Sequence, residues 1–203
     1  MKASGPAAVL AALFLGAAVL WWGTEGFRVF TAEGARRAAV ERSPRPLPEV
    51  AMEDQAAKAV SLADFRGRVV LLDFVYTRCP TVCTVLGTGF QRLRQQIVGS
   101  GLEGQVVLVT FSFDPEHDGA AQLQDYADRY GGADSNWHFV RAPSRADTDT
   151  LLRAAELVAV PDGFGGYVHN AAIHVVDREG RLARIVDTEA TDEAFRLARS
   201  LLR

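Results

Sequence analysis

The residues best suited to chemistry are two cysteines, and the 203-residue chain has no others. Cys79 and Cys83 enclose Pro80, Thr81 and Val82, where an apolar stretch gives way to a helical pattern that Pro80 helps to start. The positive end of a helix stabilises a thiolate, which makes a cysteine placed there a nucleophile or a metal ligand. Side chains four residues apart on a first helical turn share one face, so the sulfurs can form a disulfide or bind one ion. Thiolates favour Cu(I) or zinc, and the plain alternative is a pair of unreactive core cysteines.

Two thiolates leave a metal site incomplete, and any of four histidines could supply a further ligand. His169 is the strongest candidate because it follows the glycine-rich stretch 163–167, whose glycines would let a loop carry a ligand in or out. His174 alternates with apolar residues in a predicted strand, and His117 lies in a helix-capping loop, so both are expected to be structural or exposed. His138, beside a tryptophan in a short predicted strand, is a weak candidate.

Three charged residues lie where they could assist the cysteines. Arg78 directly precedes Cys79, and it would stabilise the thiolate, belong to a docking face, or simply be a solvated charge. Asp114 would either cap the helix expected from residue 118 or brace the cysteine loop. Asp73 lies inside an apolar strand, and a buried carboxylate there needs a partner, which would let it support the site. The alternative is a position near the surface of the sheet.

Strand and helix patterns alternate from residue 60 to the end of the chain. Residues 68–76 and 105–113 are nearly continuous in apolar and β-branched residues, which predicts buried strands. The other expected elements are helices at 81–98, 118–130, 146–157 and 192–202, a strand at 137–140, and a hairpin of 171–177 with 181–186. This order is typical of the α/β class, and specifically of a thioredoxin-like sandwich with a central mixed β-sheet. In such a fold the loop before His169 faces the cysteine turn.

The amino end is far more apolar than the rest of the chain. Residues 7–22 are all apolar or glycine, which predicts a membrane anchor or an export signal within residues 1–25. Trp21 and Trp22 suit an interfacial aromatic belt and no cleavage site follows closely, so an anchor is favoured over a cleaved signal. Basic residues on both sides leave the orientation open. The signal-like architecture favours an extracytoplasmic, oxidising location for the rest of the protein.

Residues 26–57 are predicted to be a linker, because the prolines at 44, 46 and 48 favour extended polyproline II geometry. The folded domain is then expected at 58–203. The net charge is −3, from 22 basic and 25 acidic residues with no basic block, so a nucleic-acid partner is not expected.

With these residues in place, the sequence resembles the Sco/SenC family of membrane-anchored, thioredoxin-like copper chaperones. The resemblance covers about residues 45–200, and it is carried by residues 73–83 (DFVYTRCPTVC), residues 112–116 (SFDPE), and His169 eight residues before Asp177. It implies that Cys79, Cys83 and His169 bind one copper ion per chain. It further implies that the protein helps deliver copper to the binuclear centre of a respiratory cytochrome c oxidase, with an oxidase subunit or another copper chaperone as partner.

The resemblance also implies a thiol-disulfide role, and two residues depart from the family pattern. Thr84 stands where proline is common, and Val168 where an acidic residue is common; neither change removes a ligand, but the second bears on loop movement and partner recognition. The alternative hypothesis is an extracytoplasmic thiol-disulfide oxidoreductase that uses Cys79 and Cys83 without metal. A third, a peroxiredoxin-like peroxidase, would need neither His169 nor the three-residue spacing.

Overall fold

The computed structural model describes residues 4–24, 26, 29–79 and 81–203, so Pro80, expected at a helix start, lies outside the described residues. The chain divides into two compact units, one ending at Arg42 and the other running from Ser43 to Arg203. We call the second the folded unit. The first contains helices α1 (Ser4–Gly23) and α2 (Ala32–Arg42).

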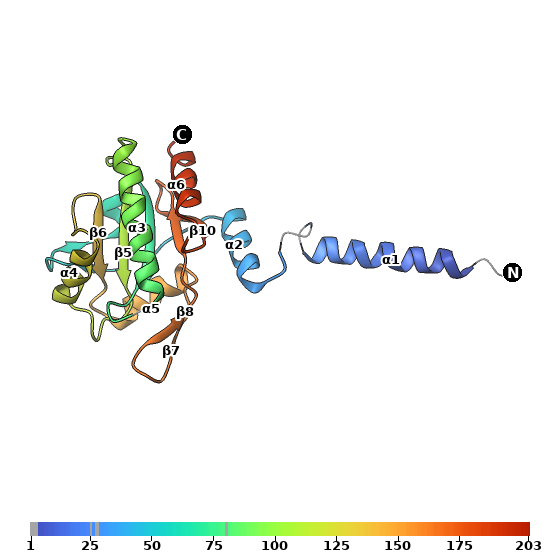
Figure 1. Ribbon diagram of the computed structural model, residues 1–203, viewed down its shortest axis with the longest axis horizontal. Coiled ribbons are helices and arrows are strands. Elements are labelled where there is room, and N and C mark those ends of the chain that lie inside the picture. Colours follow the sequence, from blue (N-terminus) through green and yellow to red (C-terminus); the bar gives the residue numbers. More distant parts are fainter. Residues whose placement is uncertain (1–3, 25, 27–28, 80) are drawn as a thin grey trace. The chain divides into compact units, whose positions relative to one another are not determined.

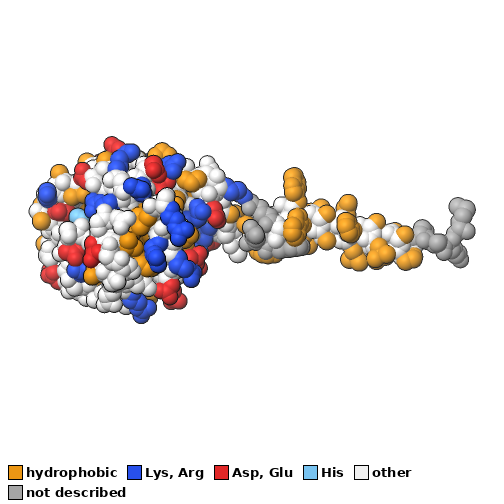
Figure 2. Space-filling view, turned by 90° about the horizontal axis from the view of Figure 1, so that it is seen from above, with side chains coloured by type: hydrophobic (Ala, Val, Ile, Leu, Met, Phe, Trp, Pro, Cys, Tyr) orange, Lys and Arg blue, Asp and Glu red, His pale blue; other side chains and the backbone are white. Residues whose placement is uncertain are grey.

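Helix α1 is the apolar segment expected at the amino end. It has 20 residues without a charged side chain, and its stretch Gly5–Gly23 is long and apolar enough to cross a membrane, with none of it buried. Figure 2 shows hydrophobic side chains along this helix, in contrast to the interspersed charges over the folded unit. The prediction of an apolar segment of membrane-spanning character is confirmed by length and composition.

The folded unit is built on a sheet of eight strands, in the order β1-β10-β9-β4-β5-β6-β2-β3 (Figure 1). At its centre β4 (Val69–Val75) pairs in parallel with β5 (Val106–Ser112), and every residue of both strands is buried. Strand β6 (Trp137–Arg141) continues in parallel beyond β5. The hairpin of β9 (Ile173–Val176) and β10 (Arg181–Val186) is antiparallel and borders β4. The predicted central mixed sheet and its apolar strands are confirmed.

The stretch expected to be a linker contains regular secondary structure. Part of it forms α2, and it also contributes two short strands to the sheet, β1 (Arg45–Pro46) and β2 (Met52–Asp54), which are joined by β3 (Ala59–Val60) just after it. Between and within them Leu47, Val50 and Met52 are buried. The folded unit therefore begins at residue 43 instead of 58, because edge pairing and three buried apolar side chains outweigh the extended preference of the prolines.

Four helices cover the sheet, each within three residues of its predicted ends: α3 (Val82–Gly99), α4 (Ala120–Arg129), α5 (Arg145–Ala154) and α6 (Thr191–Ser200). Helices α3 and α6 pack together against the sheet, as Figure 1 shows. A short 3-10 helix, η1 (Leu62–Phe65), precedes β4. Helix α3 is the element that carries one of the two cysteines.

Gly87, in the middle of α3, allows this helix to approach α4. A Cβ atom added at Gly87 would lie 2.3 Å from the ring of Tyr130, at the end of α4. We expect Gly87→Ala to destabilise the folded unit by about 1 to 3 kcal/mol, since overpacking outweighs the roughly 1 kcal/mol helix propensity of alanine over glycine. Urea denaturation measures this, with Gly99→Ala as the control because a Cβ there meets no atom within 4 Å. Equal stability of both variants would contradict the packing role.

Candidate metal centre

The two cysteines lie at the junction between the central strand and its following helix. Cys79 precedes α3 and Cys83 is the second residue of the helix. The backbone N–H of Cys83 donates to Sγ of Cys79 at 3.5 Å, so the turn brings the two residues together as their spacing predicted. Both are free thiols; Cys79 is 7% exposed and Cys83 is fully buried.

The two thiols differ in acidity because they have different surroundings. Burial opposes ionisation of Cys79, but hydrogen bonds from the Cys83 thiol and from the backbone of Cys83 and Thr81 outweigh it and lower the pKa of Cys79. Burial raises the pKa of Cys83 well above its ordinary range, and the neighbouring Cys79 adds to the rise. The pair therefore offers one slightly exposed sulfur whose ionisation is favoured and one fully buried sulfur whose ionisation is opposed.

His169 lies at the end of a strand, where a loop residue was expected. Strands β7 (Ala159–Pro161) and β8 (Tyr167–His169) form a two-stranded hairpin separate from the main sheet. The His169 ring packs edge-on against Phe113, with centroids 5.1 Å apart. Both ring nitrogens are buried and have no hydrogen-bond partner among the residues that the structure describes, and burial lowers the pKa of His169. A neutral imidazole with unused nitrogens is the form that binds metal.

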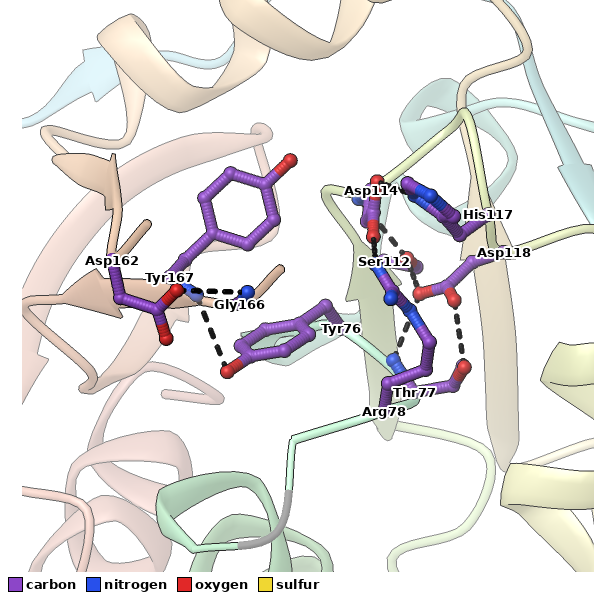
Figure 3. A network of polar contacts seen from close by, with 10 residues as sticks. All are labelled: Tyr76, Thr77, Arg78, Ser112, Asp114, His117, Asp118, Asp162, Gly166 and Tyr167. Atoms are coloured by element: carbon purple, nitrogen blue, oxygen red, sulfur yellow. Dashed lines mark hydrogen bonds and ion pairs between the residues drawn. The ribbon is translucent and has the colours of Figure 1, made fainter. Parts of the chain in front are cut away.

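Aromatic side chains connect the hairpin with the cysteine turn. The rings of Tyr76, Phe113 and Tyr167 contact one another, with centroids 5.4 to 5.6 Å apart. The Tyr76 hydroxyl accepts a hydrogen bond from the backbone N–H of Tyr167 at 3.3 Å (Figure 3), and Cys79 is close enough to contribute to the raised pKa of Tyr76. Sequence reasoning assigned these aromatics no role, although Tyr76 and Phe113 directly follow the two central strands, where a site is expected in an α/β sheet.

The structure brings the two cysteines together but does not add the histidine to them. Within residues 4–24, 26, 29–79 and 81–203, no three His, Cys, Asp or Glu side chains are grouped closely enough to hold a metal ion. Cys79 and His169 both border the cluster of Tyr76, Phe113 and Tyr167. The three-ligand site therefore remains a prediction.

Asp118 holds the strand-helix junction in place, a role not anticipated from the sequence. Its buried carboxylate accepts hydrogen bonds from the backbone N–H of Thr77 at 2.8 Å and from the Thr77 hydroxyl at 2.6 Å. The hydroxyl of Ser112, at the end of β5, donates to the same carboxylate (Figure 3). The sequence did contain one signal for this role. A carboxylate follows shortly after the second buried strand, and that strand ends beside the first one at the same edge of the sheet.

Asp114 braces the cysteine loop through Arg78 and does not cap α4, whose N-cap is Gly119. The fully buried Asp114 carboxylate accepts from Arg78 at 2.8 Å and lies 3.0 Å from Nδ1 of His117 (Figure 3). Burial opposes ionisation of Asp114, but His117 and Arg78 outweigh it and lower its pKa. Arg78 therefore has a structural partner, while 44% of its side chain stays exposed beside Cys79.

Asp73 is fully buried in β4, so the alternative of a position near the sheet surface is wrong. Neither carboxylate oxygen has a hydrogen bond in the described part of the chain. Thr110, opposite it on β5, accepts from the Trp137 indole N–H at 3.0 Å. Burial raises the pKa of Asp73 from 3.8 to about 7, which the nearby Thr110 only partly offsets. Asp73 is close enough to Cys83 for its charge to raise the pKa of that thiol.

The contacts of the two remaining histidines indicate packing roles and not metal binding. His174 is buried in β9 with Nε2 3.1 Å from the backbone carbonyl of Ala155, and its ring packs edge-on against Phe74. Its register partner is Leu72, so it occupies the face of the sheet opposite to Asp73. His138 packs on Phe65, with ring centroids 4.9 Å apart. His174 is structural, as predicted.

Together these features define a thioredoxin-like α/β protein with a dithiol at the junction between its first central strand and the following helix. The SCO1/SenC family model matches residues 48–199, and the chain belongs to that family. It is 28% identical over 134 residues to the SCO1 protein homolog of Bacillus subtilis, covering 65% of this chain and 68% of the relative.

Solved structures agree with this assignment. BsSco, described as a member of the Sco family of cytochrome c oxidase assembly proteins with a disulfide switch, matches with a TM-score of 0.69 at 24% identity, covering 78% of this chain and 94% of that one. Bradyrhizobium japonicum ScoI, solved with copper bound, matches with a TM-score of 0.65 at 25% identity, covering 77% and 99%.

Proposed function

We propose that the protein is a copper chaperone that binds one copper ion through Cys79, Cys83 and His169 and helps deliver it to the copper centre of a respiratory cytochrome c oxidase. Its copper-accepting partner is an oxidase subunit or another copper chaperone. Helix α1 anchors it in a membrane, with the folded unit on the extracytoplasmic side, where a free dithiol requires active reduction.

The observation that carries this proposal is the combination of free donor atoms near one aromatic cluster. Two unoxidised sulfurs lie together, and the imidazole of His169 has both nitrogens buried without a partner. Burial of a polar atom without a hydrogen bond costs free energy, so the unpartnered nitrogens support a role for this imidazole as a ligand and not only as a packing group. Soft thiolates with one imidazole suit copper, and ScoI of Bradyrhizobium japonicum is a relative solved with copper bound.

A second candidate function is thiol-disulfide exchange without metal, favoured by the different acidity of the two thiols. The Cys79 thiol, which is 7% exposed and has a lowered pKa, and the fully buried Cys83 thiol next to it suit attack followed by resolution. Chelation needs both sulfurs at once, whereas the first step of exchange needs only Cys79. BsSco is described as having a disulfide switch, which supports keeping this candidate.

Copper titration of the full chain in detergent tests the leading proposal. The reduced protein is titrated with Cu(I) and with Cu(II), and binding is read by absorption and by the ratio of metal to protein after gel filtration. One tightly bound copper per chain is the expected result. No binding of either ion would leave the oxidoreductase as the better proposal.

His169→Ala is expected to weaken copper binding by at least about tenfold, since even residues that only orient ligands cost tenfold to a hundredfold. The two sulfurs remain, so binding is weakened and not abolished. Competition with a chelator of known affinity measures the change. The control is His138→Ala, which removes a histidine that packs on Phe65 and should leave copper affinity unchanged. Equal affinities of both variants would remove His169 from the site.

A further inference from the structure

A cleft next to the cysteine turn is not explained by metal binding. It has a volume of about 420 Å³, within the range of small-molecule sites, and Cys79, Arg78, Arg129, Gln122 and Asp125 contribute to its lining. Cys79 reaches the cleft, whereas Cys83 is fully buried. A small molecule in the cleft would therefore lie against one sulfur of the pair.

Charged groups in the cleft are held apart from one another. Asp125 and Arg129 are four residues apart on α4, a spacing that ordinarily allows an ion pair. No such pair links them in the described part of the chain, because the Arg129 guanidinium donates to the Thr77 carbonyl at 3.4 Å and lies over the Tyr126 ring at 5.6 Å. Arg78, on the cysteine side, uses one nitrogen for Asp114 and keeps other donors for a ligand.

This arrangement fits one class of ligand. Two guanidiniums suit two carboxylates, one free carboxylate suits one ammonium, and the Cys79 sulfur suits a thiol or disulfide. We propose that the cleft binds a small cysteine peptide with carboxylates and an ammonium group, of the glutathione type, and presents its sulfur to Cys79. The inference uses the reactivity of the cysteine pair but does not require copper binding.

The chemistry balances when the ligand is the disulfide of that peptide. The Cys79 thiolate attacks one ligand sulfur, the ligand S–S bond breaks, and a mixed disulfide forms on Cys79. The released peptide leaves as a thiolate and takes up the proton that Cys79 lost. Cys83 then attacks the Cys79 sulfur, which forms the Cys79–Cys83 disulfide and releases the second peptide with the Cys83 proton. The ligand disulfide gains two electrons and the protein dithiol loses two.

The test uses the full chain in detergent with Cys83→Ser, which stops the reaction at the mixed disulfide. Intact-mass spectrometry follows adduct formation with glutathione disulfide and with the uncharged 2-hydroxyethyl disulfide. The ratio of the two rates measures preference for the charged ligand. We expect Arg129→Gln to lower this ratio about fivefold, the upper range for one exposed charge pair. The control is Arg92→Gln, an exposed arginine of α3 outside the cleft, which should keep the ratio.

Asp125→Asn separates a specific cleft from general attraction of anions. Glutathione disulfide carries net negative charge, so loss of a carboxylate would raise its rate if only long-range attraction acted. If Asp125 binds the ligand ammonium, the same substitution lowers the ratio, and this is the expected result. A raised ratio for Asp125→Asn, or an unchanged ratio for Arg129→Gln, would overturn the proposal. Failure of copper titration in the unsubstituted chain would instead count against the proposed function alone.

Discussion

Replacing either cysteine by serine is expected to abolish tight copper binding. A hydroxyl has nearly the shape of a thiol but is a hard, neutral donor, so it does not replace a thiolate toward Cu(I). We expect the affinity of Cys79→Ser and of Cys83→Ser to fall by more than about a hundredfold, the upper cost of losing a residue that only supports a ligand. Competition against a chelator of known Cu(I) affinity measures both variants.

The control is Thr84→Ala, which changes an exposed side chain next to Cys83 and should leave copper affinity unchanged. The two cysteine variants also separate the two candidate functions. If the protein acts only by thiol exchange, Cys83→Ser still forms mixed disulfides and Cys79→Ser does not, while copper affinity is low from the start. Tight copper binding retained in either cysteine variant would contradict the proposed centre.

The stability of the folded unit is expected to fall as the pH rises from about 4 to about 7, because of Asp73. Burial raises the pKa of this carboxyl from 3.8 to about 7 in the folded state, so the folded state holds the proton more tightly than the unfolded chain does. The stabilisation that comes from this difference is fully present below pH 3.8, falls progressively between the two pKa values, and is gone once the pH exceeds about 7. At 1.36 kcal/mol per unit, the full loss is about 4 kcal/mol.

Asp73→Asn removes this ionisation, so the difference in unfolding free energy between wild type and variant should change by about 4 kcal/mol between pH 4 and pH 8. Urea denaturation of residues 43–203 across this range measures it. The comparison with the variant is needed because other groups also change the stability with pH. Burial lowers the pKa values of His138 and His169, which makes the stability rise with pH over part of the same range in both proteins. Asp149→Asn, which changes a partly exposed carboxylate paired with Arg145, is the control. Parallel pH profiles for wild type and Asp73→Asn would contradict the assigned burial effect.

Local patterns were sufficient for most of the fold. The stretches 68–76 and 105–113 are nearly continuous in apolar and β-branched residues, which predicts buried strands, and they form β4 and β5. The helices were found because their apolar residues repeat at helical spacing. The short strands β1 to β3 were missed because two or three residues carry no periodic signal. The pairing of β1 with β10 and of β2 with β6 also depends on partners far along the chain.

The candidate site was only partly accessible to sequence reasoning. Cys79 and Cys83 are close in sequence, so local geometry alone predicts their contact. Asp118 was missed because its partner Thr77 is 41 residues away, and the contact exists only once β4 and β5 end side by side. His169 was expected in a mobile loop, but the pairing of β7 with β8 makes it the end of a hairpin.

The sequence by itself determined which groups are candidates for chemistry, because the types and spacing of two neighbouring cysteines, a histidine that follows a glycine-rich stretch and an apolar amino end do not depend on long-range contacts. Tertiary structure decided how that chemistry is controlled. Burial raises the pKa of Cys83, whereas hydrogen bonds lower that of Cys79 in spite of burial. Burial also leaves the His169 nitrogens without partners among the described residues and raises the pKa of the Asp73 carboxyl to about 7. These effects arise from removal of water and from contacts between distant segments, and neither is encoded in any local pattern.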